Sequence, residues 1–180
     1  EAFDPSRGPL TRYLGGGGLS DELRACPTFA GTLEGLRDKG QGFESGAGGY
    51  GYNNAFVGVD RVMRGGVWKV WTDKVGARSH RFAEPVRTIA FADAAFTGRD
   101  RVIEYSFVEP RVWPDAPTYR PDPSMHFRHA DRANVAWLDG HVSAEARTFT
   151  WSGWSSRLDA GEAGLGWTGH SDDNALFDYD

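Results

Sequence analysis

Four side chains of types that bind transition metals lie within sixteen residues of the sequence: His126, His129, Asp139 and His141. Imidazole and carboxylate groups are common ligands of zinc, and all direct ligands of one zinc ion lie about 2 Å from it. If the four side chains converged in a cleft, the chemistry they would support is metal-dependent hydrolysis. A metal-dependent hydrolase is therefore one hypothesis for the function.

The segment between His129 and Asp139 argues against a shared ion. Residues 133–138 have the alternation of an extended strand, whose ends would lie roughly 17–20 Å apart at about 3.3 Å per residue. His129 and Asp139 would then lie at opposite ends of this strand. We therefore expect no transition-metal site here. The alternative is that Asp139 shapes a turn, His129 hydrogen-bonds a loop, and His141 is a half-exposed strand residue.

Asp139-Gly140 is a dipeptide that favours a two-residue hairpin turn, because both central positions of that turn need positive φ. The turn predicts a register that pairs Leu138 with His141, Trp137 with Val142, Ala136 with Ser143, and Val135 with Ala144. One face would then collect the apolar residues Ala133, Val135, Trp137, Val142, Ala144 and Ala146. A slip of one residue would turn the apolar set outward, so pattern and turn together predict strands at 133–138 and 141–146.

The spacing of His129, nine intervening residues, and Asp139-Gly140 resembles the motif of the prepilin-like H-X9-DG family, a group of pilin-related proteins. Other segments resemble that family in the same order along nearly the whole chain. They are Arg24-Ala-Cys26-Pro27, Tyr50-Gly-Tyr-Asn-Asn54, Thr88 to Asp93, and Leu165-Gly-Trp-Thr-Gly169 followed by Asp173-Asn174.

The resemblance implies a type IV pilin-like or type II secretion pseudopilin-like head. In that architecture a long N-terminal helix packs across an antiparallel sheet and anchors the precursor in the membrane before assembly. Residues 1–180 do not include such a stem, so we expect that any membrane contact would need a helix absent from this chain. The resemblance further implies an extracytoplasmic location, partners that are other pilin-like subunits or exported cargo, and a structural or binding role in place of catalysis.

Length and composition agree with one folded head. The chain has 180 residues with 39% hydrophobic and 25% charged residues, and its 24 glycines and 9 prolines predict long loops. We expect a single α+β domain over 1–180, with a loop-rich segment at 1–50 and a sheet-containing core at 51–180. Five prolines between Pro110 and Pro123 predict an extended surface loop.

The elements expected elsewhere are short. Two short helices are predicted in the first third, one from Ser20 to just before Cys26-Pro27 and one from Leu33 to Lys39. Further strands are predicted at Tyr50 to Val59, Val67 to Trp71, Val86 to Ala92, and Arg101 to Val108.

The charge and the cysteine content argue against nucleic-acid binding and against cysteine-based chemistry. The formal net charge is −5 and there is no basic run, so we expect no nucleic-acid binding. The single cysteine, Cys26, cannot form an intrachain disulfide and lacks the spacing of a zinc or redox motif. It also has no local signature of a catalytic thiol.

The C-terminal segment concentrates oxygen donors at Asp172, Asp173, Asn174 and Asp178, which suit calcium. The spacing is not that of an EF-hand, but the resemblance adds that major pseudopilins carry calcium near the C-terminus. Calcium is therefore a candidate ligand. The alternative is a solvated acidic tail.

Tryptophans Trp151, Trp154 and Trp167 could form an aromatic platform for sugar rings or cargo, with Trp113 as a further member. This gives a second hypothesis, a carbohydrate- or cargo-binding head. The alternative is that these indoles are buried packing, and their exposure distinguishes the two.

Overall fold

The structure, a computed structural model, describes residues 25–37, 47–153 and 158–180. One helix, α2 (Pro27–Arg37), and ten short strands lie in these ranges. The strands are β1 (Tyr50–Tyr52), β2 (Asp60–Arg64), β3 (Val67–Thr72), β4 (Ile89–Asp93), β5 (Phe96–Thr97), β6 (Val102–Ile103), β7 (Met125–His126), β8 (Arg132–Trp137), β9 (Val142–Ala146) and β10 (Leu165–Gly166). All pairings between these strands are antiparallel. The prediction of mixed α and β content is confirmed, although the described residues contain little helix.

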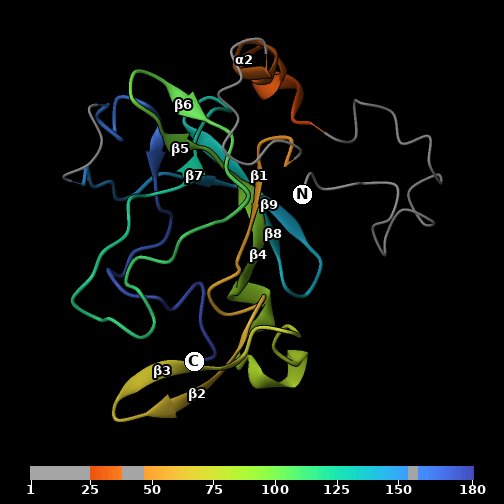
Figure 1. Ribbon diagram of the computed structural model, residues 1–180. Coiled ribbons are helices and arrows are strands. Elements are labelled where there is room, and N and C mark those ends of the chain that lie inside the picture. Colours follow the sequence, from red (N-terminus) through yellow and green to blue (C-terminus); the bar gives the residue numbers. More distant parts are fainter. Residues whose placement is uncertain (1–24, 38–46, 154–157) are drawn as a thin grey trace.

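The central sheet has four strands in the order β1-β4-β8-β9. Figure 1 shows α2 beyond one end of this sheet and the β2–β3 hairpin beyond the other. One face of the sheet is packed: Ile89, Ala133 and Val135 are fully buried there. These residues belong to the main core, which also contains Phe56, Trp167 and Phe177.

Helix α2 begins at Pro27, where the fixed φ of proline suits the first helical position. Phe29, Leu33 and Leu36 follow at helical spacing and are buried. The predicted start of this helix at Leu33 was wrong by about two turns, and its predicted end at Lys39 lies outside the described residues, as does most of the helix predicted from Ser20.

The strand predicted from Tyr50 to Val59 ends at Tyr52, because Asn53 turns the chain. The Asn53 side chain accepts a hydrogen bond from the backbone N–H of Phe56 (3.2 Å) and donates to the carbonyls of Ile89 (2.9 Å) and Phe177 (2.8 Å). Asn53 is fully buried, and the three hydrogen bonds of its side chain fix the turn.

Three other strand predictions meet different outcomes. The strand predicted at Val67 to Trp71 is confirmed as β3. The strand predicted at Val86 to Ala92 begins only at Ile89, since a 3-10 turn occupies Pro85–Arg87. Only Val102–Ile103 of the segment Arg101 to Val108 is a strand.

The hairpin of β8 and β9 exists as predicted, but its predicted register was wrong by one residue. Ala136 pairs with Val142 and Val135 with Ser143. The connection has three residues, since Trp137 N donates to His141 O (2.9 Å), and Gly140 takes the positive φ of 97°. A three-residue loop ending in a left-handed glycine competes with the two-residue turn for the same sequence.

This shift has the consequence expected of a slipped register. Ser143 and Glu145 of β9 are half-buried on the packed side, and the apolar residues Val142, Ala144 and Ala146 are exposed on the other. The predicted apolar face is therefore confirmed for β8 and wrong for β9.

The segment Pro110–Pro123 has no regular strand or helix, as predicted, but it is not a surface loop throughout. Pro110, Pro114, Pro121 and Pro123 are buried. Asn174, in the C-terminal part of the chain, holds the segment by two hydrogen bonds. Its side-chain amide accepts from the Val112 N–H (3.0 Å) and donates to the Val112 carbonyl (2.7 Å).

Candidate functional site

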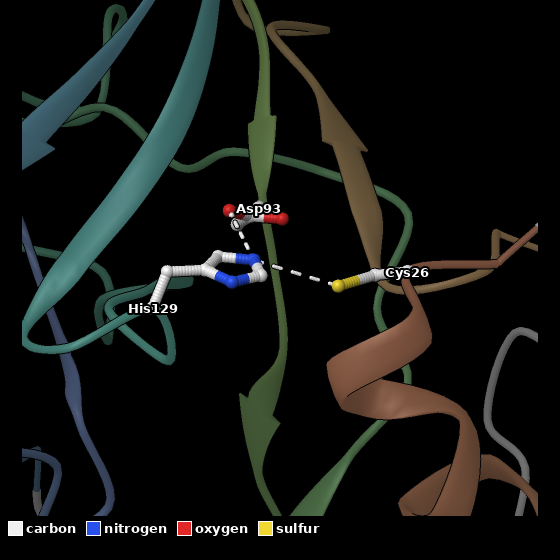
Figure 2. A group of neighbouring side chains, drawn as sticks. All are labelled: Cys26, Asp93 and His129. Atoms are coloured by element: carbon white, nitrogen blue, oxygen red, sulfur yellow. Dashed lines mark hydrogen bonds and ion pairs between the residues drawn. The ribbon is translucent and has the colours of Figure 1, made fainter.

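Three potential ligand side chains from distant parts of the chain converge at one end of the central sheet (Figure 2). Cys26 lies directly before α2, Asp93 is the last residue of β4, and His129 lies in the turn before β8. Sγ of Cys26 is 3.5 Å from Nε2 of His129, and the same nitrogen is 3.2 Å from Oδ2 of Asp93. Cys26 and Asp93 are buried, with exposed fractions of 2% and 1%.

Asp93 lies two residues after Phe91 and therefore points to the same side of the sheet. Both of its oxygens have partners: Oδ2 accepts from the N–H of Asn134 (2.7 Å), and Oδ1 accepts from Nη2 of Arg128 (2.5 Å). A buried carboxylate needs such partners. Asp93 is thus held in place by the neighbouring strand and by Arg128.

Arg128 connects the cysteine and the aspartate. Its Nε donates to Sγ of Cys26 (3.2 Å), its Nη2 donates to the Gly49 carbonyl (2.6 Å) as well as to Asp93, and its guanidinium lies over the Phe29 ring. The side chain is only 4% exposed. Because the guanidinium is a rigid fork of donors, it fixes the positions of sulfur and carboxylate relative to each other.

A tight turn places His129. The backbones of His129 and Arg132 exchange hydrogen bonds of 3.0 and 3.2 Å, and both intervening residues have positive φ, Ala130 at 53° and Asp131 at 60°. This conformation costs a non-glycine residue on the order of 1 kcal/mol. The turn directs the imidazole toward Cys26 and Asp93, with Nδ1 lying 3.5 Å from Oγ1 of Thr28.

The four residues first considered as a metal site do not share one location in the described structure. His129 precedes β8, and Asp139 follows it, as predicted. Asp139 shapes the turn, since Oδ1 accepts from the N–H of His141 (3.1 Å) and lies 2.7 Å from its Nδ1. His126 lies nearer the site, because its Nδ1 is 3.3 Å from Nη1 of Arg128.

Sequence reasoning did not predict that Cys26 and Asp93 lie beside His129. The three residues are separated by up to 103 positions, so no local spacing could reveal the cluster. The sequence contained only an indirect indication, because each of the three residues belongs to a segment that resembles the H-X9-DG family.

The oxygen-rich C-terminal segment is packed and not a free tail, because Phe177 and Tyr179 are buried. Asp172 accepts two hydrogen bonds from Arg120 (2.8 and 2.7 Å), and Asp173 accepts from Ser171 and from the Ala175 N–H. The predicted calcium ligands are therefore engaged separately with protein donors. Among the described residues, the one group of three or more closely spaced thiol, imidazole and carboxylate ligands is that of Cys26, Asp93 and His129.

The predicted tryptophan platform is wrong for Trp167. Trp167 is fully buried, which contradicts its assignment to a ligand-binding surface. Trp151 is 40% exposed, Trp113 is half-buried, and Trp154 lies outside the described residues.

The geometry of the cluster distinguishes a metal-ligand set from a catalytic triad. In a nucleophile-base-orienter triad, the imidazole uses one nitrogen for the nucleophile and the other for the carboxylate. Here Nε2 faces both Sγ and Oδ2, and Nδ1 faces Thr28. The cluster therefore has the convergent arrangement of a ligand set and not that of a triad.

Comparison of the chain with protein-family models, with curated proteins and with solved structures gives no match. The functional interpretation consequently rests on the residues themselves.

A pH dependence of stability follows from His126. Burial, with a further contribution from the Arg128 guanidinium, lowers the pKa of His126 from 6.5 to about 4. Because the unfolded chain binds the proton more tightly, stability is fully present above pH 6.5 and is lost as the pH falls toward 4. We expect a loss of roughly 2 kcal/mol over this range. Urea unfolding at several pH values should show it, and His126→Gln should remove it.

Asp178 provides a control, because its contribution to stability changes with pH in the opposite direction to that of His126. Burial raises the pKa of Asp178 from 3.8 to about 6, so this carboxyl contributes stability at low pH that is lost as the pH rises toward 6. Asp178→Asn should therefore make stability rise more steeply with pH, whereas His126→Gln should make it rise less. Equal slopes for both variants would contradict the assignment.

Proposed function

We propose that this chain is the head of a pilin-like or pseudopilin-like subunit that acts outside the cytoplasmic membrane. Its role is structural or binding and not catalytic, and its partners are other pilin-like subunits or exported cargo. The observation that carries the proposal is an exposed apolar face on the central sheet.

This face crosses all four strands. Phe91 of β4 pairs with Tyr52 of β1 and with Ala136 of β8, and Ala136 pairs with Val142 of β9. Phe91 is 48% exposed and Val142 66% exposed. We call the row Tyr52, Phe91, Ala136 and Val142 the outer row.

An antiparallel sheet with one solvated face normally carries polar residues on that face. The outer row instead holds aromatic, branched and small side chains: Phe91 and Val142 are exposed, Tyr52 and Ala136 are half-buried, and Ala144 beside the row on β9 is also exposed. Exposed apolar side chains that gather on one face are typical of an interaction site. An amphipathic helix laid across the strands would bury this patch, which is the place that the pilin-like architecture gives to its stem helix.

The described part of the chain contains no helix with the length and apolar character needed to cross a membrane. In the proposal, membrane contact belongs to a stem encoded before Glu1. The arrangement of the H-X9-DG segments lends further support, because three of them supply Cys26, Asp93 and His129 to one cluster.

The first experiment is to read the coding sequence upstream of Glu1. We expect a segment of about 20 apolar residues, long enough to span a bilayer, immediately before the head. An upstream region without such a segment would overturn the pilin-like assignment.

A second experiment tests the docking face in the full-length protein. Val142→Asp places a charge in the outer row, and it should release the stem from the head and reduce assembly, measured by cross-linking of the stem to β9. Val86→Asp is the matched control, since Val86 is similarly exposed (54%) but lies in the Pro85–Arg87 turn. Equal cross-linking of the two variants would count against the face.

The carbohydrate-binding hypothesis has less support. It needs several indoles on one surface, whereas Trp167 lies in the core. The metal-dependent hydrolase hypothesis needs His126, His129, Asp139 and His141 in one cleft, and β8 separates His129 from Asp139.

A further inference from the structure

We propose that Cys26, Asp93 and His129 form a binding site for a single zinc-class transition-metal ion. The inference does not depend on the pilin-like assignment, because it concerns three side chains and their geometry. The three donor atoms all lie within 4.8 Å of one another.

Two of the three distances between the donors match those required by a tetrahedral ion, and the third, between sulfur and the carboxylate, is at most 4.8 Å. With Zn–S of about 2.3 Å and Zn–N and Zn–O of about 2.0–2.1 Å, a tetrahedron requires about 3.5 Å between sulfur and nitrogen and about 3.3 Å between nitrogen and oxygen. The observed separations are 3.5 Å for Sγ to Nε2 and 3.2 Å for Nε2 to Oδ2. An ion could therefore be bound with little movement of these two pairs of donors.

The surroundings orient the ligands as outer partners of a metal site do. A proton on Nδ1 of His129 would face Oγ1 of Thr28, which leaves the Nε2 lone pair directed at the ion. The Asn134 N–H and Arg128 hold the carboxylate.

The charges of the site favour one class of metal. A thiolate and a carboxylate supply two negative charges, and Arg128, 3.2 Å from the sulfur and 2.5 Å from the carboxylate, offsets one of them. A hard cation such as calcium depends on several anionic oxygens. Sulfur and imidazole instead suit zinc and its neighbours.

His129 gives the site its connection with solvent. Its side chain is 28% exposed, whereas that of Asp93 is fully buried. The three donors leave the fourth tetrahedral position to water or to a further ligand, the arrangement that lets a zinc ion interact with exogenous groups.

The test uses Co²⁺ as a spectroscopic probe on the chain with reduced Cys26, after treatment with a chelator. We expect one Co²⁺ per chain, a thiolate-to-cobalt charge-transfer band in the near ultraviolet, visible bands of tetrahedral intensity, and displacement by Zn²⁺. Cys26 is the only cysteine of the chain, so such a band identifies its sulfur as a ligand. Cys26→Ser should abolish the band, and His129→Gln should weaken binding at least tenfold.

His141→Gln is the matched control, because His141 also contacts a carboxylate, that of Asp139, but lies beyond β8. It should leave Co²⁺ binding unchanged. Zn²⁺ should also raise the thermal midpoint of the unaltered chain and not that of Cys26→Ser, by mass action on the folded state. Absence of the thiolate band, or unchanged affinity in His129→Gln, would overturn the site and would leave the pilin-like proposal untouched.

Discussion

Trp167→Ala should destabilise the protein by about 3–5 kcal/mol, the range for removing a large aromatic side chain from a core. Trp167 is fully buried, its indole Nε1–H donates to the Glu109 carbonyl (2.9 Å), and its ring lies 5.7 Å from that of Phe149. Alanine would leave a cavity and an acceptor without its donor. Urea unfolding should therefore show a lower midpoint with little change in slope.

Trp151→Ala is the control for this prediction. Trp151 is 40% exposed, and a substitution at such a surface position should change the free energy of unfolding by no more than about 0.5 kcal/mol. If Trp151→Ala cost as much as Trp167→Ala, the assignment of Trp167 to the core would be wrong. Comparing the two variants also distinguishes a packing role from a ligand-binding role, because substituting a residue of an exposed binding platform would weaken binding without lowering stability.

Local patterns in the sequence predicted the strand at 133–138, its buried face and the reversal of the chain at Asp139-Gly140. They failed to predict the register, because Asp-Gly suits a two-residue turn and Gly140 also suits the end of a three-residue loop. Residues 142–146 alternate between apolar and polar types, but two of the three apolar residues are alanines, which gain little from burial, so the alternation could not decide between the two turns. The same slip exposes Val142 and creates part of the outer row.

The candidate site could be predicted only in part. His129 was recognised as a motif residue, but its partners come from the start of a helix and the end of another strand. Cys26 and Asp93 have no local pattern that marks them, because their proximity follows from sheet order and from the buried contacts of Arg128. Tertiary contacts of this kind are not contained in local spacing.

Asp93→Asn should destabilise the chain by about 3–5 kcal/mol, the usual cost of removing one partner from a buried ion pair. Oδ1 of Asp93 is 2.5 Å from Nη2 of Arg128, and the exposed fractions of the two side chains are 0% and 4%. Asparagine keeps the size of the side chain but leaves the guanidinium as a buried, uncompensated charge. The measurement is urea unfolding at pH 7.

Glu84→Gln is the matched control. Glu84 and Arg87 form an ion pair at 3.0 Å whose side chains are 54% and 62% exposed, so its loss should cost at most about 1 kcal/mol. Both variants should be measured with a chelator present, because the Asp93–Arg128 pair stabilises the fold without any ion. A loss below about 1 kcal/mol for Asp93→Asn under these conditions would contradict the structural role of the pair. A large loss with chelator, together with Co²⁺ binding that requires Cys26 and His129, would show that the Asp93–Arg128 pair stabilises the fold independently of the metal.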